Sequence, residues 1–124
     1  NNNPYLIAVT LLTSIDSKAL EKIGITSSID DQILNLAISA SQAKLDGIVC
    51  SAKDIINIRN SLPENFLYIT PGIRLDNKAK DDQKRITTPL DAVKMGSKIL
   101  VVGRPITQAE NPAIVLNQII DEIS

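Results

Sequence analysis

Residues 45–52 read Leu45-Asp46-Gly47-Ile48-Val49-Cys50-Ser51-Ala52, and this stretch joins a helical pattern to a strand and that strand to a second helical pattern. The run from Gly47 to Cys50 is short, apolar and continuous, which is typical of a strand that is buried on both faces. Ser51 follows at once and is placed to cap the next helix. Stripes at helical spacing lie on both sides of the strand: Ile33, Ala37, Ile38, Ser41 and Leu45 before it, and Ile55, Ile58 and Leu62 after it.

The same alternation continues along the chain. Apolar runs rich in β-branched residues at 5–12, 66–70 and 99–102 predict three further strands. Strict alternation of strands and helices indicates parallel strands joined by right-handed crossovers, with helices covering the sheet. Two architectures satisfy this order, a small doubly wound sheet and half of an eight-stranded barrel, and periodicity does not choose between them.

Two more helices are predicted by their start signals. One begins at Thr88, with Pro89 at the first helical position and Asp91 three residues after the cap, a near match to a capping box. The other begins at Asn111-Pro112, and a short helical piece is expected at residues 17–23. The last helix is expected to bury an apolar face made of Leu116, Ile119, Ile120 and Ile123.

Length, charge and composition indicate one globular domain. A chain of 124 residues with 44% hydrophobic residues can build one core. Its 13 basic and 14 acidic residues give a formal charge of −1, which favours neither nucleic acid nor a membrane as a partner. Histidine is absent, which excludes His-based triads and His-ligated metal sites. A single cysteine and the lack of an apolar run of about 18 to 20 residues favour a cytoplasmic location.

Two arginines follow predicted strand ends, each after a turn glycine. The fourth strand is followed by Gly103-Arg104-Pro105 and the third by Pro71-Gly72-Ile73-Arg74. A glycine lets a ligand approach the backbone N–H, and a guanidinium presents a planar fork that suits phosphate oxygens. Because ligands bind at the carboxyl ends of parallel strands, Arg74 and Arg104 are candidates for one anion site. The alternative is a plain turn with two solvated arginines.

Other polar residues near strand ends carry weaker signals. Thr13 and Ser14 follow the first predicted strand and could bind the edge of a heterocycle or cap a helical turn near Asp16. Cys50 is expected to be a small buried hydrophobe. The Lys and Asp residues within helices are assigned to solvated faces. Residues 71–87 form a long connection with little apolar content, which makes it a candidate lid over an anion.

Five segments carry a more specific signal: Leu6 to Ser14, Leu45 to Ala52, Thr70 to Arg74, Asp82 to Arg85, and Val102 to Thr107. In this order and with this spacing they resemble the successive motifs of bacterial orotidine 5′-phosphate decarboxylase. The resemblance spans almost the whole chain and corresponds to strands five to eight of the family's TIM (β/α)8 barrel. It therefore favours an α/β half-barrel over the doubly wound sheet.

The resemblance implies an activity. Enzymes of this family remove CO₂ from orotidine 5′-phosphate to give UMP, the last step of pyrimidine biosynthesis, with no metal and no cofactor. Their catalytic lysine belongs to an Asp-x-Lys-x-x-Asp motif on strand three, which the resemblance places before Asn1. We therefore expect no catalytic residue in this chain and no activity from it alone.

The resemblance also assigns substrate contacts. Thr13 is placed near the pyrimidine or ribose, with Ser14 and Pro71 as further candidates. The residues assigned to the phosphate and lid are Arg74, Gln83, Gly103 and Arg104.

Residues 1–124 are thus expected to be the C-terminal half-barrel of one domain. Four strands of an eight-stranded barrel leave two unpaired edges and an apolar inner face. The expected partners are the N-terminal half that carries the catalytic motif and, in a homodimer, a second complete barrel. The start Asn1-Asn2-Asn3-Pro4 resembles neither an initiator methionine nor a signal peptide, so we expect a longer parent. Two alternatives are another sugar-phosphate barrel enzyme, such as an isomerase or epimerase, and a non-enzymatic phosphate-binding α/β module.

Overall fold

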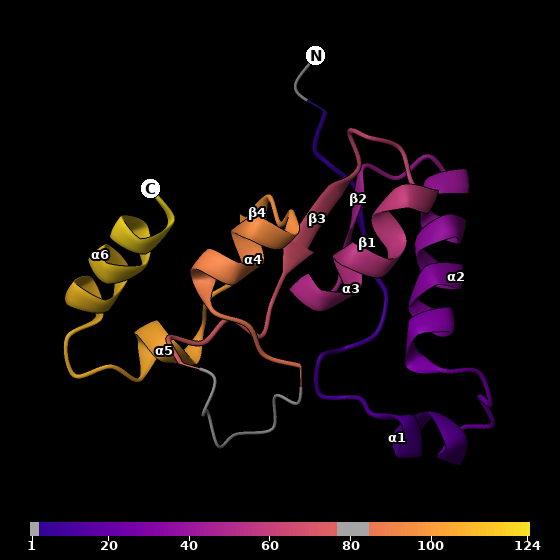
Figure 1. Cartoon of the computed structure of the whole chain (residues 1–124), viewed down its shortest axis with the longest axis horizontal. Helices are drawn as coiled ribbons and strands as arrows, with labels where there is room; N and C mark the ends of the chain where they lie inside the picture. Colours follow the sequence, from indigo (N-terminus) through magenta and orange to yellow (C-terminus); the bar gives the residue numbers. More distant parts are fainter. Residues whose placement is uncertain (1–2, 77–84) are drawn as a thin grey trace.

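The computed structural model describes residues 3–76 and 85–124, in which four parallel strands form one sheet (Figure 1). The strands are adjacent in chain order, β1-β2-β3-β4, and all three pairings are parallel. A doubly wound sheet reverses its strand order at a switch point, whereas a barrel keeps sequential order. The observed order is therefore that of a barrel arc. The strands are β1 (Ile7–Val9), β2 (Gly47–Val49), β3 (Leu67–Thr70) and β4 (Ile99–Leu100), each predicted from the sequence and each shorter than its apolar run.

The helices follow the predicted alternation. The helices that follow β1, β2, β3 and β4 include α2 (Ile29–Gln42), α3 (Ala52–Ile58), α4 (Pro89–Met95) and α6 (Pro112–Ile123). The expected short piece after β1 is α1 (Ser17–Lys22), whereas the turn of helix α5 (Arg104–Thr107) was not predicted. Figure 1 shows α1 below α2 and α5 below α4, well apart in the lower half of the view.

Local signals explain where the helices begin and end. The side chain at each of four N-caps accepts a hydrogen bond from the backbone N–H three residues on. Gly96 ends α4 in the left-handed conformation, with φ of 111°, which a glycine adopts without strain. The four capping residues are Asp16, Ser28, Thr88 and Asn111.

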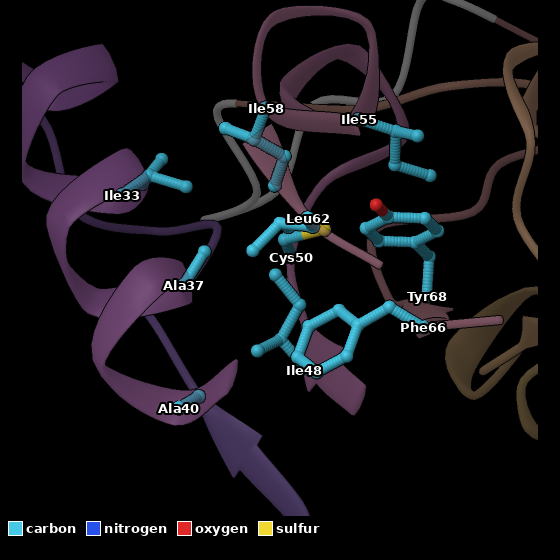
Figure 2. Packing of buried hydrophobic residues seen from close by; sticks show 10 residues of the cluster. All are labelled: Ile33, Ala37, Ala40, Ile48, Cys50, Ile55, Ile58, Leu62, Phe66 and Tyr68. Atoms are coloured by element: carbon cyan, nitrogen blue, oxygen red, sulfur yellow. The ribbon is translucent and has the colours of Figure 1, made fainter. Parts of the chain in front are cut away.

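The core lies between the helices and one face of the sheet (Figure 2). Ile33, Ala37 and Ala40 of α2 point toward Ile48 and Cys50 of the sheet. The buried members contributed by α3, by the segment after it and by β3 are Ile55, Ile58, Leu62, Phe66 and Tyr68. A second cluster, of Ala52, Ile73 and Ala92, continues this layer beneath α4, with Leu100 and Val102 packed against it. The covered face of the sheet is thus filled from β2 to β4.

The opposite face of the sheet corrects one expectation. Val9, Val49, Ile69 and Ile99 are aligned by the strand register and form one row across this face. Val9 is 56% exposed and Ile99 is 49% exposed, so the prediction that the strands are buried on both faces is wrong for the edge strands β1 and β4, whereas Ile69 of β3 is buried. The described helices cover only the other face, so this row lacks a layer packed against it.

The last helix also differs from its expected burial. α6 packs against α4 and α5, and of the four residues predicted to be buried only Ile119 is so. Leu116, Ile120 and Ile123 are exposed, because α6 stands at the end of the arc with a neighbour on one side only among the described residues. Within those residues, no helix has the length and apolarity needed to cross a membrane.

Candidate functional site

A pocket of about 150 Å³ opens at the carboxyl ends of β3 and β4. Residues from both strand ends line it, which brings Arg74 and Arg104 to one cavity as the sequence predicted. The sheet places them there because neighbouring parallel strands end at the same edge. The lining residues are Pro71, Gly72, Arg74, Val101, Gly103 and Arg104.

Arg74 is held on a rigid piece of backbone. Its N–H donates to the Thr87 carbonyl at 3.0 Å, and the Thr87 N–H donates to the Gly72 carbonyl at 3.1 Å. These bonds form a parallel bridge between Ile73 and Thr87, so both ends of the long connection after β3 are joined. The Arg74 side chain is buried, and its Nη1 donates to the Ile73 carbonyl at 2.8 Å. The guanidinium is therefore oriented before any ligand arrives.

Gly103 and Arg104 form the other wall of the pocket. The Gly103 carbonyl accepts hydrogen bonds from Ile106 at 2.9 Å and Thr107 at 3.0 Å, which starts α5 directly at the strand end. A Cβ built on Gly103 would meet no atom within 4 Å, so the space in front of its backbone is open. Arg104, the first residue of α5, is half-buried beside it.

Thr13 and Ser14 form a turn after β1. The Ile15 N–H donates to the Leu12 carbonyl at 3.0 Å and closes a turn with Thr13 and Ser14 at its centre. The cap of α1 is Asp16, whose carboxylate accepts from Ala19. The alternative in which the two hydroxyls cap this helix is therefore wrong. Thr13 is buried, and neither residue lines the pocket of the two arginines.

A buried ion pair lies near these strand ends. Asp54, in the first turn of α3, is only 5% exposed and pairs with Arg85 at 2.9 Å. Its assignment to a solvated helix face is therefore wrong, because the guanidinium compensates its charge inside the protein. The Ser51 N–H also donates to the Asp54 carboxylate at 2.8 Å, as expected for the cap of α3. The spacing of a carboxylate three residues after a capping Ser signals the bond between Asp54 and the Ser51 N–H, but not the pair with Arg85.

Cys50 ends β2 as the small buried hydrophobe that was predicted. Burial raises the pKa of its thiol to about 12, and the nearby Asp54 carboxylate adds to this shift while Arg85 opposes it. A thiol with this pKa stays protonated and unreactive at neutral pH. Across residues 3–76 and 85–124, no three Cys, Asp or Glu side chains gather where a metal ion could bind.

The sequence pattern of the orotidine 5′-phosphate decarboxylase / HUMPS family matches residues 1–119. The chain belongs to this family. It is 50% identical over 121 residues to the orotidine 5′-phosphate decarboxylase of Saccharophagus degradans, a match that covers 98% of this chain and 51% of that enzyme. The enzyme of the same name from Legionella pneumophila strain Corby is 46% identical over 122 residues, or 98% of this chain and 53% of the relative.

A solved decarboxylase structure also matches this chain in its fold. The crystal structure of orotidine 5′-phosphate decarboxylase from Lactobacillus acidophilus superposes with a TM-score of 0.80 at 35% identity, covering 98% of this chain and 50% of that one. The fold is thus the half of a TIM barrel that the family resemblance predicted. The chain spans about half the length of the curated relatives it matches.

Two motifs overlap residues 77–84, which the structure does not describe. Gln83 and most of the candidate lid lie within residues 77–84, outside the described residues. The spacing Asp-x-Lys-x-x-Asp does occur in this chain, at Asp76, Lys78 and Asp81, although the family resemblance places the catalytic motif on a strand before Asn1. Asp76 follows β3 in the long connection, and Lys78 and Asp81 also lie outside the described residues.

Proposed function

We propose that this chain is the phosphate-binding half of an orotidine 5′-phosphate decarboxylase, which releases CO₂ from orotidine 5′-phosphate and forms UMP. The decarboxylases of Saccharophagus degradans and Legionella pneumophila, which match almost all of the chain, support this activity. The observation that carries the proposal is the shared pocket of Arg74 and Arg104 at the strand ends.

The pocket suits the phosphate of a nucleotide. Two guanidiniums can offer paired N–H donors to the oxygens of a dianion, and the open backbone at Gly103 allows close approach. Such contacts lie far from the carbon that loses CO₂. Their binding energy would organise the site and hold the reacting end in place. In this arrangement Thr13 and Ser14 face the pyrimidine or ribose, and Pro71 borders the phosphate.

The other half of the barrel would cover the open face of the sheet. β1 and β4 are the two edges of the described sheet, and Val9 and Ile99 are exposed on its uncovered face. Exposed strand edges and an exposed apolar face both favour association with further strands. We propose that the N-terminal half supplies those strands and the catalytic lysine. Two complete barrels would associate as a homodimer in the cytoplasm.

Arg104 offers the most direct test of the phosphate site. Arg104→Ala in the complete barrel should weaken UMP binding by about 2 to 5 kcal/mol, the usual cost of removing one partner of a desolvated charged pair. Isothermal titration calorimetry would measure the loss. Arg59, an exposed arginine after α3, provides a matched control, since Arg59→Ala should leave the affinity unchanged. A change of less than a few tenths of a kcal/mol for Arg104→Ala would exclude it as the phosphate ligand.

A complementation assay tests the division of the barrel. The portion of the Saccharophagus degradans relative that this chain does not match, produced together with residues 1–124, should restore decarboxylation of orotidine 5′-phosphate. Each half alone should be inactive. Preferential stabilisation of the complex by a sugar phosphate over UMP, measured by scanning calorimetry, would instead favour an isomerase or epimerase.

A further inference from the structure

Arg85 joins two parts of the molecule that are far apart in the sequence. Its Nη1 donates to both carboxylate oxygens of Asp54, at 3.2 and 2.9 Å. Its Nη2 donates to the carbonyls of Leu11 and Leu12, at 3.1 and 3.0 Å. One guanidinium therefore connects the first turn of α3 with the backbone that leaves β1.

The anchored backbone is the turn that carries Thr13. The Leu12 carbonyl accepts from both Arg85 and the Ile15 N–H, so Arg85 holds the same group that closes the turn. Thr13 and Ser14 follow directly and have little freedom to move without breaking these bonds. A small residue in place of Arg85 would leave two carbonyls without a side-chain donor.

The backbone just after Arg85 is held by a bridge to the segment of Arg74. Thr87, two residues on, forms the bridge to Ile73 that holds Arg74. Arg85 thus lies between the turn of Thr13 and the backbone of Arg74. The Arg85 Nε is buried with no hydrogen-bond partner among the described residues. An unpaired buried donor costs free energy, so the contacts of Nη1 and Nη2 must offset this cost.

We propose that Arg85 is a positioning residue that sets Thr13 against the base of the nucleotide. This inference rests on the proposed function. Because Arg85 holds the turn rather than the phosphate pocket, its loss should weaken contacts to the base more than contacts to the ribose phosphate. Asp54 has the supporting role, since it fixes the guanidinium and is itself fixed by the Ser51 N–H.

The test compares UMP with ribose 5-phosphate, which keeps the phosphate and sugar but lacks the base. Arg85→Gln in the complete barrel should weaken UMP binding by about tenfold, a typical coupling between contacting residues, and ribose 5-phosphate binding by less than about twofold. Its kcat/KM should fall on the order of 100-fold, as expected when a substrate contact is misplaced. Arg59→Gln is the matched control and should change none of these values.

Arg85→Lys is a second variant, which tests the proposal even if Arg85→Gln fails to fold. Lysine keeps the charge opposite Asp54 but lacks the planar fork that reaches both carbonyls, so this variant should stay folded and still lose UMP affinity relative to ribose 5-phosphate. Amide hydrogen exchange gives a readout that needs no ligand. The Ile15 N–H should exchange at least several-fold faster in both variants, because the turn it closes is released.

The outcomes separate the two proposals. Equal losses for UMP and ribose 5-phosphate, or no change in either, would overturn the positioning role of Arg85. Wild-type protein that binds neither ligand would overturn the proposed function instead, and the Ile15 exchange rate would still report whether Arg85 anchors the turn.

Discussion

The two faces of the sheet carry similar apolar side chains but differ in what covers them. On the face toward α2 and α3, Ile48, Cys50 and Tyr68 are buried in one packed cluster. On the opposite face, Val9 and Ile99 lie at the two ends of an aligned row and remain about half exposed. The described residues thus complete the helical layer over one face, and the open ends of the other face support the proposal that a further half of the barrel covers it.

The largest expected effect comes from the covered face. Ile48→Ala should lower the free energy of unfolding of the complete barrel by about 3 to 5 kcal/mol, because Ile48 is fully buried and its truncation removes apolar contacts and leaves a cavity. Guanidinium unfolding measures the change. A cost below about 1 kcal/mol would mean that the cluster of Figure 2 is loosely packed.

A substitution on the uncovered face tests whether a partner half buries that face. Ile99→Ala should destabilise the complete barrel by about 2 to 3 kcal/mol, since the proposed N-terminal half would bury this side chain. Guanidinium unfolding again measures the change. Its matched control is Ile56→Ala on α3, because Ile56 is 48% exposed in this chain and Ile99 is 49% exposed.

The control separates burial within this chain from burial by its partner half. Ile56→Ala should change the stability by no more than about 0.5 kcal/mol, as is usual for a surface position. Equal effects of the two substitutions would show that the inner face stays open in the complete protein. The proposal of a covering half would then fail.

Local signals in the sequence are sufficient to predict the helices, the strands and part of the candidate site. Ser51 and Thr88 are predictable caps because the bonds of a cap form within one turn: the Thr88 side chain accepts from the Asp91 N–H, and the Ser51 N–H donates to the Asp54 carboxylate. Arg74 and Arg104 were paired because parallel strands end at one edge, and both line the observed pocket. Each inference used only short-range chemistry or a general rule of topology.

Long-range features could not be predicted in this way. Periodicity identified the apolar faces at Val9 and Leu116, but it does not say whether another element covers them. The partner of Asp54 lies 31 residues away at Arg85, so nothing in the local spacing indicated that its charge would be buried and paired. The errors therefore fall where tertiary contacts decide the outcome.

The smallest expected effect concerns Cys50, in the covered cluster. Burial raises the pKa of its thiol to about 12 from an ordinary value of 9.0, so the folded protein keeps a proton that the unfolded chain releases above pH 9. Stability should therefore fall as the pH rises through this window, with a limiting slope of about 1.4 kcal/mol per pH unit. Between pH 8.5 and 10 the loss should reach about 1 kcal/mol.

Guanidinium unfolding of wild type and Cys50→Ala under reducing conditions isolates this thiol. Tyr68, whose pKa is raised by burial and further by the charge of Cys50, titrates in both proteins, so the difference between their stability curves reports Cys50 and its coupling to Tyr68. The two curves should run parallel below pH 8 and converge or cross above pH 9, as the wild type loses the advantage of its protonated thiol. Curves that stay parallel to pH 10 would mean that Cys50 is open to water in the complete barrel. That result would contradict the dense packing of the covered face, on which the comparison of the two faces depends.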